Sequence, residues 1–195
     1  MPGKESGGVG NFWYSFDYGL AHFISFDGET DYANSPESNF ITDTKGRNST
    51  PVPSETFAND AGPFGYIEGW GNNTYNNSAY EQYQWMKADL AAVNRTKTPW
   101  IICSSHRPMY STANATYQLH MREAFQDLWL EYGVDLYVAG HIHWYERLWP
   151  VTRNGTVDHK AVVNNNTYKT NPGVSITHII NGMAGNIETH SKSCP

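Results

Sequence analysis

Two histidines separated by one residue follow an apolar run, in a pattern that could place two metal ligands in one small volume. Residues 134–139 are typical of a buried strand, and they lead into Gly140, His141, Ile142 and His143. Side chains two apart on extended backbone point to the same side, and neutral imidazole is the commonest metal ligand among protein side chains. The spacing therefore predicts that His141 and His143 bind a metal ion. The alternative is a pair of ordinary loop histidines that bond to backbone groups.

A third histidine follows a second short apolar run. Residues 100–104 are expected to form a buried strand, and His106 comes just after it, followed by Arg107. Open α/β sheets bind ligands beyond the carboxyl ends of their strands, so we expect His106 to lie near the first pair. Arg107 could bind phosphate oxygens through two N–H groups. The alternative is an arginine that is simply solvated where the strand ends.

The remaining periodicity predicts the elements that must position these loops. Four more strands are expected, at residues 11–18, 20–26, 145–151 and 174–181. Two helices are expected, at residues 78–94 and 115–132, the first with a capping box at its start and the second with Gly133 at its end. The apolar stripe of the first helix is Tyr83, Met86, Leu90 and Val93. Helices that alternate with strands favour an α/β fold.

Polar residues inside the expected strands have mostly structural interpretations. His22, Cys103 and His178 lie in expected strands, so burial is expected for all three. Asp135 stands five residues before the glycine of the histidine motif and is expected to be structural. Glu146 could fix an imidazole through its free ring nitrogen, or it could form a salt bridge with a neighbouring arginine. Residues 27–76 form a polar insert that is too long for a simple loop.

Composition excludes some classes of protein and favours others. The chain of 195 residues has a formal net charge of −6 with 13 lysines and arginines, which argues against nucleic-acid binding. No apolar run approaches the roughly 20 residues that span a bilayer, and the polar residues 1–8 give no signal peptide. An excess of Asn-x-Ser/Thr glycosylation sequons nevertheless favours a secreted parent protein. These sequons begin at Asn48, Asn72, Asn76, Asn94, Asn114, Asn154 and Asn165.

Three segments together give the chain a specific resemblance to a known family. The segments are residues 105–110 (SHRPMY), residues 140–147 (GHIHWYER) and residues 181–186 (NGMAGN). They resemble the C-terminal part of fungal-type purple acid phosphatases, in the calcineurin-like metallophosphoesterase superfamily, and residues 12–24 resemble the strand pair that opens the second half of that catalytic domain. The resemblance implies an α/β (α+β) fold, the second half of a four-layer α-β-β-α sandwich. It also implies hydrolysis of phosphate monoesters by a dinuclear metal centre, Fe plus Zn, Mn or Fe.

The resemblance assigns roles to individual residues. His106 and His141 should bind the divalent metal, and His143 the ferric ion. His120 is the nearest candidate for the family's histidine that binds phosphate and protonates the leaving group, although its spacing from His106 differs from the family pattern. Tyr145 could line the substrate pocket or pack within the fold.

The family's first three motifs are absent from this sequence. They carry two aspartates, a tyrosine, an asparagine and a histidine, and the chain contains neither a Gly-Asp nor an Asn-His dipeptide. Residues 1–195 are therefore expected to form a partial catalytic domain whose partner is a missing N-terminal half or another copy of the chain. Its activity alone should be absent or feeble, because two cations held close together repel without bridging carboxylates. A phosphodiesterase or nucleotidase and a non-catalytic fragment are the alternatives, whereas a carbohydrate-binding module would not explain the histidines.

Overall fold

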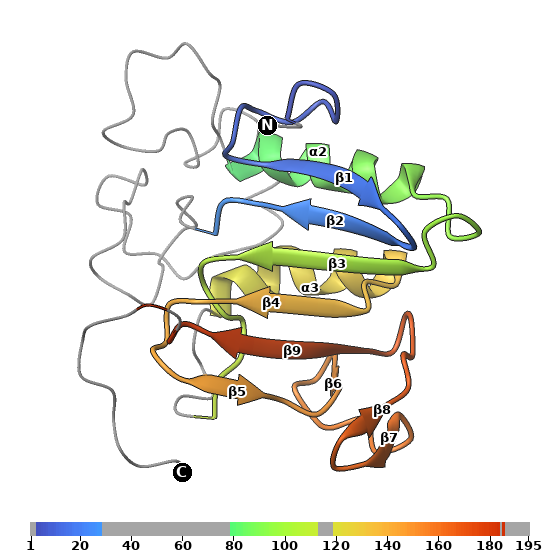
Figure 1. The fold of residues 1–195 in the computed structure, drawn as a ribbon, viewed down its shortest axis with the longest axis vertical. Coiled ribbons are helices and arrows are strands. Elements are labelled where there is room, and N and C mark those ends of the chain that lie inside the picture. The colour runs from blue at the N-terminus through green and yellow to red at the C-terminus, as the bar shows by residue number, and fades with distance from the viewer. Residues whose placement is uncertain (1–2, 29–78, 113–118, 184, 186–195) are drawn as a thin grey trace.

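The fold is built on a mixed β-sheet, seen in a computed structural model that describes residues 3–28, 79–112, 119–183 and 185 (Figure 1). The strands lie in the order β1 (Tyr14–Tyr18), β2 (Ala21–Ser25), β3 (Trp100–Ser105), β4 (Leu136–Ala139), β9 (Ser175–Asn181) and β5 (Tyr145–Arg147). The central strands β2, β3, β4 and β9 are parallel. β1 and β5 close the two edges in antiparallel pairing, and β6 (Val151–Thr152) also pairs with β9. The expected α/β arrangement is confirmed.

Two helices, α2 (Ala79–Ala92) and α3 (Leu119–Tyr132), lie together on one face of this sheet (Figure 1). Met86 and Leu90 of the α2 stripe are buried, as expected, because their side chains point at the sheet. Phe125 and Trp129 of α3 are also buried, and Gly133 ends α3 with φ at 69°, a conformation that favours glycine. Neither helix in the described ranges has the length and apolar character needed to cross a membrane.

The two faces of the sheet differ in burial because side chains alternate along each strand. On the helix-covered face, Ile24, Ile101 and Tyr137 are almost fully buried. On the opposite face, the register aligns a row of apolar side chains that runs from β1 to β4: Phe16, Phe23, Ile102 and Leu136. The Phe16 and Phe23 rings stack with centroids 5.3 Å apart, and Phe16 remains 42% exposed. This face therefore presents apolar surface that the described helices do not cover.

Some expected boundaries need correction. The strand expected at 145–151 is divided into β5 and β6, because Pro150 has no N–H to donate to a strand partner. The polar loop expected around residue 165 contains a small hairpin of β7 (Val162–Asn164) and β8 (Thr167–Tyr168). Most of the 27–76 insert, the capping box at Ser78 and residues 115–118 of the second helix lie outside the described residues.

Candidate active site

The loops after β3 and β4 bring two of the expected histidines together at the carboxyl edge of the sheet. Ser105 pairs with Ala139 at the ends of these parallel strands, so the following residues leave the sheet side by side. The Gly140 N–H donates to the His106 carbonyl at 3.0 Å and joins the two loops. Nε2 of His106 lies 3.0 Å from Nδ1 of His141, with the rings edge to face and centroids 4.9 Å apart. The expected proximity of His106 to His141 is therefore observed.

Arg107 completes this small cluster. Its side chain is buried, and Nη1 lies 2.9 Å from Nε2 of His141. Because a guanidinium only donates hydrogen bonds, Nε2 of His141 must accept. His141 is then neutral, with its hydrogen on Nδ1 directed at Nε2 of His106. Arg107 is thus not the solvated arginine of the alternative interpretation.

The facing nitrogens of His106 and His141 are spaced much as two ligands of one metal ion would be. Two imidazole nitrogens at about 2.0–2.1 Å from a tetrahedral metal lie about 3.3 Å apart, close to the 3.0 Å seen between His106 Nε2 and His141 Nδ1. A metal between them would need the lone pair of His141 Nδ1, so the ring hydrogen would move to Nε2 and the hydrogen bond from Arg107 would be given up. In the described ranges, however, no group of three or more histidine, cysteine, aspartate or glutamate side chains is placed to hold a metal ion. The described residues therefore offer part of a coordination sphere.

The backbone of the histidine motif differs from the extended form that the spacing suggested. His141 has φ at 63°, a left-handed conformation that costs energy for a residue with a Cβ. The Ile142 N–H then donates to the Gly140 carbonyl at 2.7 Å, and the Trp144 N–H to the Ile142 carbonyl at 2.8 Å, in successive tight turns. The alternation of an extended strand therefore does not apply here. The structure brings His106 and His141 together, and metal binding by His143 stays a prediction.

Two glycines allow neighbouring segments to approach these loops. A Cβ on Gly182 would lie 2.2 Å from the backbone oxygen of Ile142, so only glycine fits between β9 and the histidine motif. A Cβ on Gly28, just past β2, would lie 2.1 Å from Oγ of Ser105. The chain after β2 and the chain after β9 therefore both reach the edge where the histidines lie. The Asn181–Gly182 segment, which opens the third of the resembling segments, therefore lies against the histidine motif.

Polar side chains in β4 and just before it anchor the strand and the first histidine loop. The buried hydroxyl of Tyr137 donates to the Arg107 carbonyl and fixes the loop after β3. Oδ2 of Asp135 accepts from Nη1 of Arg95 at 2.9 Å and from the Ile101 N–H at 2.8 Å. Asp135 is therefore structural, as expected, and sequence reasoning missed the role of Tyr137.

Glu146 holds the loop near residue 111, which corrects both sequence-based interpretations of this residue. Its carboxylate accepts from the Thr112 N–H at 2.9 Å, from Nε1 of Trp144 at 3.1 Å and from Oγ of Ser111 at 3.3 Å. The following arginine, Arg147, donates instead to the Asn165 carbonyl at 2.6 Å. Glu146 thus ties the chain beyond His106 to the chain beyond His141, and among the described residues its carboxylate bonds to neither an imidazole nor an arginine.

The remaining candidates are placed as follows. Tyr145 lies on the edge strand β5 and is 56% exposed, so it is not packed within the core. His120 is the second residue of α3, and its side chain lies outside the described residues. Three sequon asparagines are exposed, in connections between elements: Asn94, Asn154 and Asn165. The other four, Asn48, Asn72, Asn76 and Asn114, lie outside the described residues.

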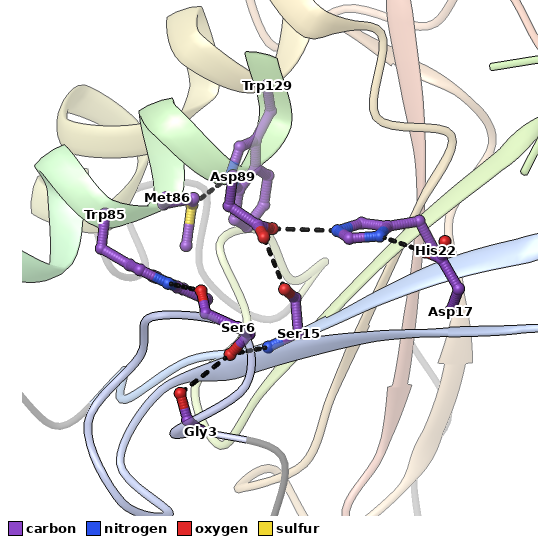
Figure 2. A network of polar contacts seen from close by, with 9 residues as sticks. All are labelled: Gly3, Ser6, Ser15, Asp17, His22, Trp85, Met86, Asp89 and Trp129. Carbon is purple, nitrogen blue, oxygen red and sulfur yellow. Dashed lines mark hydrogen bonds and ion pairs between the residues drawn. The ribbon is translucent and has the colours of Figure 1, made fainter. Parts of the chain in front are cut away.

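Two more histidines are buried away from these loops, as expected. His178 packs edge to face against Tyr110 and Tyr137, and burial, together with the positive charge of Arg122, lowers its pKa to about 3. His22 lies between two carboxylates, those of Asp17 and Asp89, an arrangement that sequence reasoning missed (Figure 2). Asp89 stands 67 residues from His22 on a different element, so no local pattern could have indicated the pairing.

Several known proteins that are similar to this chain are named as phosphatases. The family model described as calcineurin-like phosphoesterase matches residues 11–145. An acid phosphatase of Aspergillus ficuum is 64% identical over 192 residues, which is 98% of this chain and 31% of that protein. Purple acid phosphatase 23 of Arabidopsis thaliana is 31% identical over 76% of this chain and 23% of its own length.

A solved structure supports the fold. Purple acid phosphatase PPD1 from yellow lupin seeds superposes with a TM-score of 0.58 at 24% identity, over 95% of this chain and 25% of that one. The chain spans about a third or less of the length of the curated relatives named above. Because the family model covers more than half of the sequence, the chain belongs to the calcineurin-like phosphoesterase family.

Proposed function

We propose that this chain forms part of an acid phosphatase that hydrolyses phosphate monoesters at a dinuclear metal centre. The observation that carries the proposal is the pair of facing imidazoles, His106 and His141, at the carboxyl edge of β3 and β4. Edges of this kind are where open α/β sheets bind ligands. The similarity to the Aspergillus ficuum acid phosphatase supports the same activity.

In this proposal the metals are held jointly by this chain and by further ligands. His106 and His141 bind the divalent ion, and His143 binds the ferric ion. When bound, the metals polarise a phosphoryl oxygen and activate a water molecule. Residues 1–195 form a partial catalytic domain, with the insert at 27–76 inside it, and the missing ligands come from an N-terminal half or from another chain. The apolar row that includes Phe16 and Phe23 supports this view, because such a face favours a protein partner.

The chain's own residues then bind and orient the substrate. Arg107 lies against His141, so its guanidinium is positioned to donate to a phosphate oxygen next to the metal ligands. Tyr145 is exposed enough to line the pocket. His120 supplies the proton for the leaving group. The hydrogen bond from Tyr137 to the Arg107 carbonyl supports Arg107 as a fixed contact, since it limits the movement of that loop.

We further propose that the parent protein is secreted and glycosylated. Asn94, Asn154 and Asn165 are exposed, as an acceptor asparagine must be. The connection from α2 to β3, which carries Asn94, lies at the edge where the parallel strands begin, opposite the histidine loops (Figure 1). A glycan at Asn94 would leave the histidine edge open.

A chimera tests the proposed activity. This 195-residue chain replaces the matching 192-residue region of the Aspergillus ficuum acid phosphatase, which supplies the rest of the protein. We expect the chimera to hydrolyse p-nitrophenyl phosphate at acidic pH, and His106→Ala or His141→Ala to reduce turnover by about 100-fold or more, because even changes beyond the direct ligands cost about 10–100-fold. His159→Ala, at an exposed histidine, is the matched control.

The turnover and the substrate preference of the chimera separate this proposal from its alternatives. An inactive chimera with an intact fold and a full metal content would contradict the proposal, and so would equal turnover by His141→Ala and His159→Ala. Faster hydrolysis of bis(p-nitrophenyl) phosphate than of the monoester would favour a phosphodiesterase instead.

A further inference from the structure

A cluster of polar side chains joins β1 and β2 to α2 on the helix-covered face of the sheet (Figure 2). His22 pairs with Ile101 near the start of β3, whereas His106 follows the end of that strand. Nδ1 of His22 on β2 lies 2.7 Å from Oδ1 of Asp17 on β1. Nε2 of the same ring lies 2.9 Å from Oδ2 of Asp89 on α2. The other oxygen of Asp89 accepts from Oγ of Ser15 at 2.5 Å. The cluster therefore joins the β1–β2 hairpin to α2 through side chains alone.

The geometry fixes the protonation state of His22. Both ring nitrogens face carboxylate oxygens, which accept hydrogen bonds and cannot donate them when ionised. A neutral imidazole carries one hydrogen, so one of its lone pairs would face a negatively charged oxygen. An imidazolium donates to both Asp17 and Asp89. The side chains of His22 and Asp89 are 9% and 11% exposed, so water does little to weaken the second interaction.

The same cluster extends into the N-terminal segment. The Ser15 N–H donates to Oγ of Ser6 at 3.2 Å, and Nε1 of Trp85 on α2 donates to the Ser6 carbonyl at 3.0 Å. Ser6 is thereby held by both β1 and α2 (Figure 2). A change in the charge of His22 therefore acts on three segments of the chain: residues 3–8, the hairpin and α2.

We propose that His22, Asp17 and Asp89 form a proton-dependent clamp that holds α2 on the β1–β2 hairpin while His22 is protonated and loosens as the pH rises and His22 loses its second ring hydrogen. Among the described residues, the titratable groups that face this ring are Asp17 from β1 and Asp89 from α2, with the Cys103 thiol of β3 close to Asp89. Burial raises the pKa of Cys103 well above its ordinary value, so the thiol stays neutral. Loss of one proton from His22 is thus the change that breaks the clamp.

The direction of the pH effect follows from the charges. Burial disfavours the imidazolium, but the hydrogen bonds and negative charges of Asp89 and Asp17 outweigh burial and raise the pKa of His22 above 6.5. The clamp therefore contributes fully below the unfolded-state pKa of about 6.5 and is lost as the pH rises through the folded-state pKa. His178 affects stability in a lower pH range. Its folded-state pKa is about 3, so its burial costs stability only as the pH falls below about 6.5, where the unfolded chain takes up the proton.

Urea unfolding of the 195-residue chain between pH 6.5 and 8.5 tests the clamp, with His22→Gln as the key variant. We expect the folding equilibrium constant of the wild-type chain to fall over this range relative to that of His22→Gln. The fall should be centred at the midpoint of the His22 NMR titration. The folding equilibrium constant should fall by a factor of ten for each unit by which the folded-state pKa of His22 exceeds its unfolded-state pKa. His159→Gln, at an exposed histidine, should keep the wild-type dependence.

A second measurement applies even where His22→Gln does not fold. Nitrogen NMR of the wild-type chain at pH 6 should show hydrogen on both ring nitrogens of His22. Asp17→Asn changes the more exposed carboxylate and should shift the His22 titration to lower pH. A single ring hydrogen at pH 6, or a wild-type pH dependence equal to that of His22→Gln, would overturn the proposal.

Discussion

His22 and His141 are histidines of one sheet with opposite surroundings. His22 lies between the carboxylates of Asp17 and Asp89, which only accept hydrogen bonds when ionised, so both contacts are satisfied only while its ring carries two hydrogens. Arg107 donates to His141, so one nitrogen of that ring must accept. A neutral ring keeps one lone pair, which a metal can use once Arg107 no longer donates to it, whereas an imidazolium has none. The neighbours, not the residue type, therefore decide which histidine can be a ligand.

The two sites also differ in how they are enclosed. The His22 cluster lies under α2, on the face that the helices cover (Figure 2). The His141 cluster lies in loops at the carboxyl edge of the sheet, where His141 itself adopts a left-handed backbone conformation. An enclosed charge cluster contributes to stability, and a strained edge loop can serve binding. Variants at the two sites should therefore affect different properties.

The largest effect should come from removing the enclosed carboxylate. Asp89→Ala leaves a buried imidazolium with one partner, and breaking such a pair costs about 3–5 kcal/mol of unfolding free energy. Urea unfolding at pH 6 measures this loss. Asp127→Ala is the control, because its ion pair with Arg153 is largely exposed and is worth about 0–1 kcal/mol. Equal losses for the two variants would erase the distinction between the enclosed and the exposed pair.

Metal binding by this chain should depend on the edge histidines and not on His22. His141→Ala is expected to weaken Zn²⁺ or Mn²⁺ binding by about 100-fold or more, since ligand loss exceeds the 10–100-fold effect of outer groups. Calorimetric titration of the 195-residue chain measures the affinity, and His22→Gln serves as the matched control. An equal loss in both variants would mean that the edge histidines are not the ligands.

The chain alone should still hydrolyse p-nitrophenyl phosphate little or not at all, and its solution should not be purple.

The loss of unfolding free energy at acidic pH should depend on His178. Its pKa of about 3 means that the unfolded chain binds this proton first, so stability should fall below pH 6.5 by up to about 1.4 kcal/mol per pH unit. His178→Leu should reduce the pH dependence of the unfolding free energy below pH 6.5 and leave the dependence above pH 6.5 unchanged. Urea unfolding of both proteins at pH 5 and pH 6.5 measures this difference. An unchanged slope in the variant would show that His178 is not the group responsible.

The smallest effect is expected at Glu146. Glu146→Gln keeps an acceptor for the Thr112 N–H but removes the charge that strengthens the hydrogen bonds, so we expect a loss of about 1 kcal/mol. The loss should not vary between pH 6.5 and 8.5 beyond the wild-type dependence, since the His22 cluster remains intact. A change in the His22 titration on this substitution would instead couple the two regions.

Local patterns determined most of the elements. The apolar stripe of α2, the turn at Gly133 and the apolar runs of β3 and β4 are short-range features, and each is found close to its expected place. The prediction of one continuous strand at 145–151 was wrong, because Pro150 divides this segment into β5 and β6. The hairpin of β7 and β8 was missed because Asn164, Asn165 and Asn166 carry no apolar alternation.

The sequence by itself determined that the histidines follow two strands, and its motifs determined the family. Only the tertiary structure decided how the histidines are used. Arg107 meets His141 because β3 and β4 are neighbours, and Asp89 meets His22 because α2 packs on β2. Protonation and ligand geometry depend on groups within a few ångströms that stand 34 and 67 residues away in the chain. Distances of that kind are set by packing, which no local pattern encodes.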